Sequence, residues 1–237
     1  MEKSTTHLRS EPSILYFGTP VVLISTVNED GSYNLAPMSS AFWLGWRCVL
    51  GLAGVSKTPL NMRRTGECVL NLPSVDLAEA VNRLACTTGT DPVPEGKLRR
   101  GYRFEREKFA FSELTPQASE TVAAPRVQEC PVQLEAKVES IRSLADNDPA
   151  QKGGILVIEV RILRVHLEQS ILMDGHPNRV DPDKWRPLIM SFQEFYGLTA
   201  KRVLESKLGK IPERLYRGPD IEKARTEPVL ATVKSAL

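Results

Sequence analysis

The stretch PVVLISTVNEDGSYNLAPMSS, residues 20–40, predicts a β-hairpin and with it the fold class. Residues 20–28 are rich in β-branched side chains and almost all apolar, which is typical of a buried strand. Asp30-Gly31 follows at once, and this dipeptide is a strong signal for a tight hairpin turn. We therefore expect a second strand from Ser32 to about Ser39, paired with the first.

Further strands are predicted along the rest of the chain, without a regular alternation of strand and helix. Segments of strand-like composition are residues 47–52, 67–72, 132–141 and 155–167. The absence of repeated strand–helix–strand units favours an antiparallel arrangement over a doubly wound parallel sheet. We expect a mainly β fold with a few helices, built as an antiparallel barrel.

Two short helices are predicted between these strands. Thr58 is placed as the N-cap of the first, with Pro59 at the first helical position and Gly66 as the stop signal. Residues 73–74, Pro-Ser, predict the start of a second helix from about 75 to 84. Its apolar residues recur at helical spacing, which indicates core packing and no chemistry.

Composition argues against several classes of partner. Lys and Arg together number 31 against 29 Asp and Glu, so no global field attracts nucleic acid. No segment approaches the roughly 18 apolar residues of a membrane span, and residues 1–12 contain no apolar leader core, so we expect a cytoplasmic protein without membrane contact. The isolated residues Cys48, Cys68, Cys86 and Cys130 indicate neither a disulfide framework nor a metal site.

The chain divides into an expected main domain, residues 1–200, and a C-terminal extension, residues 201–237. The extension holds nine Lys and Arg against five Asp and Glu. It lacks interleaved aromatic residues beyond Tyr216, so we interpret it as a solvated, partly helical appendage rather than a nucleic-acid-binding arm. Within the main domain, residues 86–101 predict a long loop, a candidate lid or dimer-contact segment.

Polar groups concentrate at two places in the first third of the chain. Residues 34–42 end a strand and are expected to turn sharply at Pro37, which exposes backbone N–H groups and two hydroxyls. Thr58 and Asn61 lie at a helix start directly after Ser56 and Lys57, where helix donors and a cation suit a phosphate group. Each segment alone has a simpler interpretation, as a turn or as a helix cap.

Taken together and in this order, these segments resemble the flavin reductase-like FMN-binding family, the split β-barrel flavoproteins. Further stretches agree with the resemblance, which spans roughly residues 15–197: GECVLNLP (66–73), APRV (124–127), ECPV (129–132) and RVDP (179–182). The resemblance implies a split antiparallel β-barrel that binds FMN. It also implies a homodimer with its flavin sites near a shared interface.

The resemblance further implies which residues hold the FMN. The family binds the flavin at an N-x-A-P-x-S corner, here Asn34, Ala36, Pro37, Met38, Ser39 and Ser40, and the phosphate at a Thr-x-x-Asn turn, here Thr58 and Asn61 together with the preceding Ser56 and Lys57. The family's commonest form of that turn reads Lys-Asp-Thr, whereas this chain reads Ser-Lys-Thr. The lysine therefore lies next to the threonine, and Lys57 is a weaker candidate than Thr58 or Asn61.

The function that the resemblance implies is an oxidoreductase with NADH or NADPH as reductant and a small molecule or free flavin as substrate. A non-catalytic FMN-binding or electron-carrier protein is the alternative. An enzyme acting on an organic substrate beneath the 86–101 loop and the 174–187 segment is the third hypothesis. No catalytic residue is assigned, although His176, in a Gly-His-Pro loop, is a candidate because loops often carry functional side chains.

Overall fold

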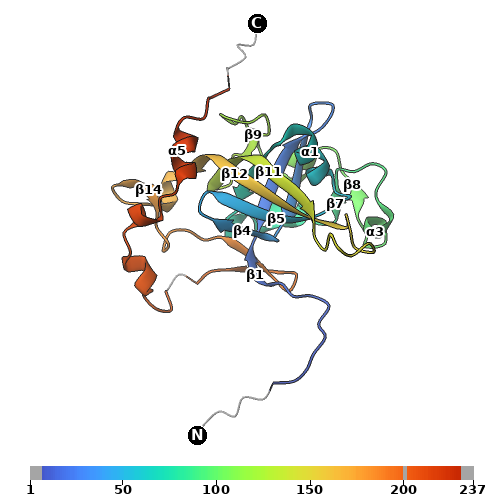
Figure 1. Cartoon of the computed structure of the whole chain (residues 1–237), viewed down its shortest axis with the longest axis horizontal. Helices are drawn as coiled ribbons and strands as arrows, with labels where there is room; N and C mark the ends of the chain where they lie inside the picture. The colour runs from blue at the N-terminus through green and yellow to red at the C-terminus, as the bar shows by residue number, and fades with distance from the viewer. Residues whose placement is uncertain (1–6, 200–201, 231–237) are drawn as a thin grey trace, which may run out of the picture.

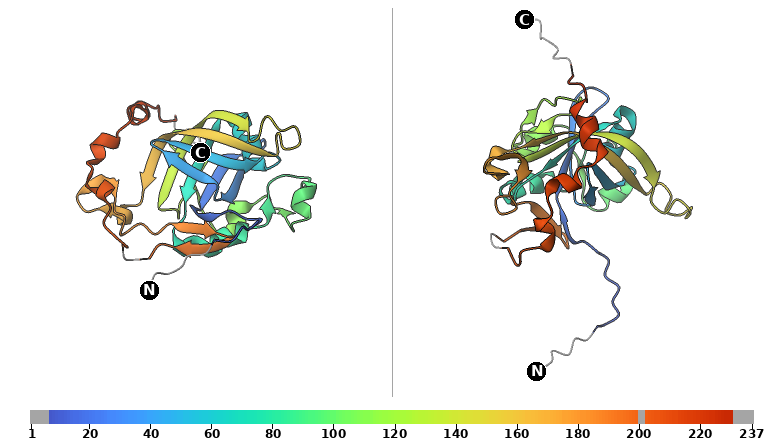
Figure 2. Two further views of the ribbon diagram at one scale, coloured as in Figure 1. Left: turned by 60° about the horizontal axis from the view of Figure 1, so that its bottom comes forward. Right: turned by 60° about the vertical axis from the view of Figure 1, so that its left-hand side comes forward.

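The computed structural model describes residues 7–199 and 202–230, and its centre is a seven-stranded antiparallel sheet (Figure 1). In spatial order the strands are β3 (Tyr33–Met38), β2 (Val22–Val27), β6 (Glu67–Leu72), β11 (Val132–Ser143), β12 (Ile155–Leu167), β5 (Arg47–Ala53) and β4 (Ala41–Leu44). All the strand segments expected from composition are present. The sheet curves strongly, as the two views of Figure 2 show.

Smaller strand groups and short helices surround this sheet. A three-stranded sheet contains β1 (Phe17–Pro20), β15 (Leu188–Ser191) and β16 (Glu194–Gly197), and the two-stranded pairs are β7 (Thr87–Thr88) with β8 (Arg103–Phe104), β9 (Pro116–Gln117) with β10 (Arg126–Val127), and β13 (Leu172–Met173) with β14 (His176–Val180). The helices are α1 (Lys57–Thr65), η1 (Val75–Leu77), α2 (Ala78–Leu84), α3 (Glu95–Leu98), α4 (Lys108–Ser112), η2 (Gln169–Ile171), η3 (Lys207–Lys210), η4 (Glu213–Tyr216) and α5 (Pro219–Arg225). None of these helices is long and apolar enough to cross a membrane.

The predicted hairpin of β2 and β3 is confirmed. Val27 faces Tyr33 at its closed end, and Gly31 adopts a left-handed conformation with φ 82° that favours glycine. Strand β2 is buried on both of its faces, and only Ser25 and Thr26 interrupt its apolar side chains. Val22 and Ile24 pack into the interior of the curved sheet, whereas Leu23 packs on the other face, with α2 and α4.

Two details of the expected local structure are wrong. Helix α1 begins at Lys57 with Ser56 as its N-cap, so Thr58 lies inside the first turn, where its hydroxyl is engaged by Asn34. The chain does not turn at Pro37, because this residue is part of β3 and lies opposite Leu23; the turn follows Met38. The expected helix at 75–84 is present as η1 followed by α2.

The C-terminal segment contains η3, η4 and α5 and runs along one side of the sheet (Figure 1). Helix α5 lies beside β12, and Arg47 Nε on β5 donates to Asp220 Oδ2 at 2.8 Å. The expected boundary between residues 200 and 201 falls outside the described residues, as do residues 1–6 and 231–237. On the opposite side of the molecule, α3, β7 and β8 form a separate projection from the sheet (Figure 1).

Candidate functional site

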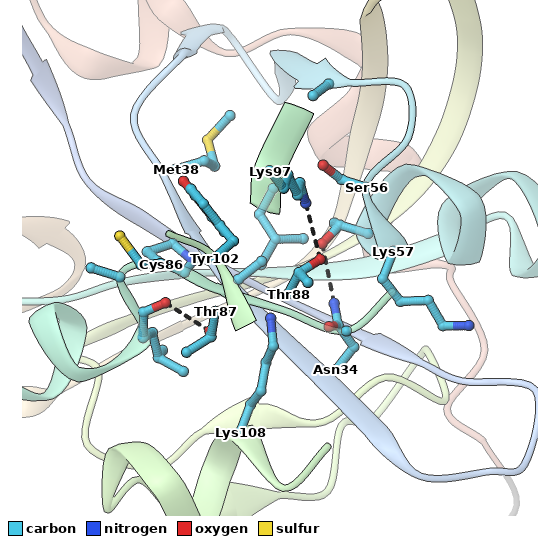
Figure 3. A pocket seen from close by; sticks show the side chains of 18 of the residues that line it. Asn34, Met38, Ser56, Lys57, Cys86, Thr87, Thr88, Lys97, Tyr102 and Lys108 are labelled. Atoms are coloured by element: carbon cyan, nitrogen blue, oxygen red, sulfur yellow. Dashed lines mark hydrogen bonds between the residues drawn. The ribbon is translucent and has the colours of Figure 1, made fainter. Parts of the chain in front are cut away.

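A pocket of about 190 Å³ lies where β3, the start of α1 and the segment 84–108 meet (Figure 3). Strand β3 contributes one wall, and the end of β5 with the start of α1 contributes a second. The third wall comes from the end of α2 and the residues up to Lys108. The pocket therefore joins the hairpin and the helix start that the sequence singled out with the segment that it left as a long loop.

Most of the sequence-predicted site residues line this pocket. They are Asn34, Ala36, Pro37 and Met38 on β3, and Ser56, Lys57 and Thr58 at the start of α1. These two groups come from segments about twenty residues apart in the chain. The hairpin places β3 alongside the helix start, because α1 packs against both β2 and β3.

Asn34 and Thr58 connect the two groups directly. Both side chains are buried, and Asn34 Nδ2 donates to Thr58 Oγ1 at 3.1 Å. The Thr58 hydroxyl accepts this bond, so its own hydrogen remains available to donate to a ligand. The Oδ1 atom of Asn34 is buried without a partner among the described residues, and such an acceptor costs stability unless a ligand or water satisfies it.

The start of α1 offers further donors. Ser56 caps the helix through its extended backbone, and its hydroxyl makes no hydrogen bond to the described residues. The backbone N–H groups of Lys57 and Thr58 have no intrahelical acceptor, as is usual in a first turn. Lys57 itself points away from the pocket (Figure 3), and its ammonium pairs with Glu29 Oε2 at 2.6 Å. The lysine beside Thr58 is thus neutralised within the protein.

Ser39, Ser40 and Asn61 are not among the residues that line the pocket. Ser39 and Ser40 follow the end of β3, and the Ser40 carbonyl accepts a bond from the Gly51 N–H. Asn61 is fully buried and donates to Thr26 Oγ1 and Asn28 Oδ1 at 3.0 and 2.9 Å. The reason is the earlier start of α1, which puts Asn61 in its second turn, against the hairpin.

His176 also lies apart from the pocket lining. It is the first residue of β14, it is exposed, and it faces Met173 across a two-stranded ladder. The geometry gives this side chain no carboxylate or thiol partner among the described residues. A role at the pocket therefore has no support from its position.

The sequence did not identify the residues that the 84–108 segment brings to the pocket. Thr88, Gly89, Lys97 and Lys108 all line it. Gly89 approaches the opposite wall so closely that a Cβ built on it would lie 2.5 Å from Asn34 Oδ1. The loop signal at residues 86–101 indicated a functional segment, but no local pattern distinguishes Lys97 within it, or Lys108 beyond it, from surface lysines.

The buried lysines change the electrostatics of the pocket. Burial, with a smaller contribution from Lys97, lowers the pKa of Lys108 to about 7. Burial and the neighbouring Arg100 also lower the pKa of Lys97. Both lysines therefore line one pocket and bear charges that burial destabilises.

A curved antiparallel barrel with a polar, cationic pocket between a hairpin and a helix start defines the class of protein to which this chain is similar. The family model described as "Flavin reductase like domain" matches residues 14–198. The chain belongs to this flavin reductase-like family. Protein YdfE of Bacillus subtilis (strain 168), described as uncharacterized, is 39% identical over 188 residues, which cover 79% of this chain and 87% of YdfE.

Solved structures confirm the split β-barrel fold. Flavoredoxin of Desulfovibrio vulgaris (Miyazaki F) superposes with a TM-score of 0.67 at 20% identity and covers 87% of this chain and 100% of its own. A proposed flavin reductase with a split barrel domain from Shewanella frigidimarina NCIMB 400 superposes with a TM-score of 0.61 at 17% identity, covering 80% of this chain and 86% of its own. At these identities the similarity concerns the fold.

Proposed function

We propose that the protein binds FMN in the pocket between β3 and α1 and acts as an oxidoreductase with NADH or NADPH as reductant. The observation that carries the proposal is the unsatisfied polar lining of the pocket: the hydroxyls of Thr58 and Ser56 are free to donate at a helix start, and the buried Oδ1 of Asn34 has no donor among the described residues. Membership of the flavin reductase-like family supports a flavin as the ligand of this lining.

The residues present fit FMN in two respects. A phosphate suits the start of α1, since backbone donors, hydroxyls and the helix dipole all favour an anion there. The pocket volume of about 190 Å³ suits the phosphate and part of the ribityl chain, so the ring system would extend along Pro37 and Met38. When bound, the isoalloxazine ring supplies the hydride and electron transfer.

The residues of the chain then only bind and position the cofactor. Thr58 would donate to the phosphate while Asn34 Nδ2 holds the Thr58 hydroxyl in place, and the segment with Thr88 and Gly89 would cover the cofactor from the other side. No acid–base pair of side chains is required for transfer between a nicotinamide and a flavin that lie against each other. The alternative, an electron carrier or FMN-binding protein, uses the same pocket without a pyridine nucleotide.

The first prediction separates these functions. Protein purified with added FMN is expected to show the visible flavin spectrum, and anaerobic addition of NADH or NADPH is expected to bleach it. We would record the spectrum during each titration, with free FMN at equal concentration as the control. Flavin that stays oxidised with both nucleotides indicates the carrier alternative. Protein that retains no flavin contradicts the proposal itself.

The second prediction is a homodimer, because aromatic side chains are exposed on the small sheet of β1, β15 and β16. Phe17, Phe192 and Tyr196 are 73%, 46% and 57% exposed, and the Phe17 and Phe192 rings contact each other at 4.9 Å between centroids. Exposed apolar patches of this kind mark interaction surfaces, and a second copy of the chain is the partner that the family resemblance favours.

Sedimentation at micromolar concentration is expected to give about twice the chain mass of 26.4 kDa. Phe17→Glu is expected to shift the protein towards the monomer, because it places a charge on the surface that the dimer would bury. Leu60→Glu, at an exposed position on α1, is the matched control. A monomer mass for the unmodified protein would rule out the dimer.

A further inference from the structure

Lys97 and Lys108 are buried cations that face the pocket from the 84–108 segment. Lys108, on α4, is 2% exposed, and Lys97, on α3, is 9% exposed. Figure 3 shows the two side chains approaching the region of Thr88 and Asn34 from opposite sides. A buried ammonium group is costly unless a counter-charge and hydrogen bonds compensate for its lost hydration.

Such compensation is incomplete among the described residues. Lys97 Nζ donates to Thr88 Oγ1 at 3.0 Å, and no carboxylate pairs with it. Lys108 Nζ makes no hydrogen bond and no ion pair within the described chain. The nearby Glu105 favours its charged form only weakly, after the opposing effects of burial and of Lys97. The pocket therefore holds two mutually repelling cations without an anion.

The start of α1 forms another wall of this pocket. It needs additional positive charge nearby to bind a phosphate dianion tightly. Pro59 occupies the third helical position and has no N–H, so this helix start has fewer free donors than usual. Lys57, the cation nearest in sequence, is already paired with Glu29. The missing positive charge is what Lys97 and Lys108 supply from across the pocket.

We propose that Lys97 and Lys108 form a clamp that closes on a phosphate dianion held against the start of α1. The anion contacts the two ammonium groups, which approach it from opposite sides, and the hydroxyls of Ser56 and Thr58 at the helix start. Only the source of the phosphate rests on the proposed function: the 5′-phosphate of FMN is the first candidate and the 2′-phosphate of NADPH the second. The clamp also fastens the 84–108 segment over its ligand.

Lys108→Met tests the clamp because it separates binding from folding. Methionine fills a similar volume without charge, so the ligand-free variant is expected to melt at the same or a higher temperature than the unmodified protein. A lysine that served the fold alone would give a lower one. Inorganic phosphate is expected to raise the melting temperature of the unmodified protein and to have no such effect on Lys108→Met. Lys152→Met, at an exposed loop position, is the matched control.

Flavin binding provides the second readout. We expect Lys108→Met and Lys97→Met each to weaken FMN binding about 10- to 100-fold, the usual range for a lost hydrogen bond to a charged group. Riboflavin, which has no phosphate, is expected to bind all these proteins with similar affinity. If instead FMN affinity is unchanged while the KM for NADPH rises and that for NADH does not, the clamp holds the nucleotide's 2′-phosphate.

The pH dependence offers a third readout. Lys108 is protonated below about pH 7 and neutral above it. The other charged groups near the two lysines are Glu105, which favours the charged form of Lys108, and Arg100, which disfavours the charged form of Lys97. Phosphate affinity is therefore expected to fall more steeply above about pH 7 in the unmodified protein than in Lys108→Met, which keeps only Lys97 as a buried titrating cation.

Two outcomes would overturn the clamp. One is an equal loss of FMN and riboflavin affinity in Lys108→Met, and the other is a phosphate effect on melting that is the same with and without Lys108. A failure of the proposed function, with the clamp intact, gives a different experimental result. In that case the unmodified protein retains no flavin, yet phosphate still stabilises it through Lys108.

Discussion

Replacing Glu135 with alanine is expected to lower the free energy of unfolding by about 3–5 kcal/mol, the usual cost of breaking a buried charged network on one side. Glu135 lies on β11 and is fully buried. Its carboxylate accepts bonds from the backbone N–H groups of Glu120 and Thr121, from the Thr121 hydroxyl and from His166 Nε2, all between 2.5 and 2.9 Å. Alanine leaves all of these donors without an acceptor.

The network also predicts a pH dependence. Burial alone would raise the pKa of Glu135, but the bonds from His166, Thr121 and the backbone outweigh it and lower the pKa to about 2. Because the folded state has the lower pKa, this stabilisation is fully present above the unfolded pKa and is lost as the pH falls from about 5 to 2. Glu135→Gln, which keeps the size, removes this part of the acid sensitivity.

Urea unfolding at pH 7 and at pH 3 measures both effects. Glu139→Ala, an exposed position on the same strand, is the matched control and is expected to cost less than about 1 kcal/mol. The account of the network is wrong if Glu135→Ala and Glu139→Ala lose similar stability at pH 7. It is also wrong if Glu135→Gln keeps the acid sensitivity of the unmodified protein.

Gly89→Ala is expected to weaken FMN binding by about 10- to 100-fold, through the cost of about 1–3 kcal/mol that overpacking usually carries. The new Cβ would lie 2.5 Å from Asn34 Oδ1 and 3.2–3.3 Å from the Lys57 side chain. Either Asn34 moves away from Thr58, or the 84–108 segment moves outwards. Either movement separates the wall formed by β3 from the wall formed by the 84–108 segment.

Gly96→Ala is the matched control, since it lies in the same segment and a Cβ there meets nothing within 4 Å. Flavin fluorescence titration gives the affinities, and thermal unfolding without ligand shows whether the fold is intact. Equal FMN affinity in Gly89→Ala and Gly96→Ala would show that the close approach of Gly89 to Asn34 has no part in binding.

Much of the fold could be predicted because its determinants are local. The run of β-branched residues before Asp30-Gly31 specifies a strand and a turn, since Gly31 alone accepts the left-handed φ there without strain. Residues 132–141 and 155–167, which their composition predicts as strands, are present as β11 and β12. Thr58 lies at the start of α1, as expected. It is not the N-cap of this helix, because Ser56, two residues earlier, is also a favoured cap residue and takes that place.

The candidate site, too, could be predicted only in part from the sequence. The sequence located Asn34, Ser56 and Thr58, since polar groups at a strand end and a helix start are visible in the order of residues. Asn61 lies outside the pocket lining, because one half-turn of helix decides whether that side chain faces the pocket or the hairpin. The sequence missed Lys97 and Lys108, because each lies in a charged stretch where a solvated lysine is the normal expectation.

The sequence by itself therefore determined the strand order along the chain, the hairpin and the polar residues at the two segment ends, all of which depend on conformational preferences of neighbouring residues. Only the tertiary structure decided which charges are buried. Lys108 and Glu135 are ordinary charged residues in the sequence, and their burial follows from what packs over them from distant segments. Burial sets the hydration of a charged group and hence its pKa and its need for a counter-charge, so the chemistry of the pocket arises at that level.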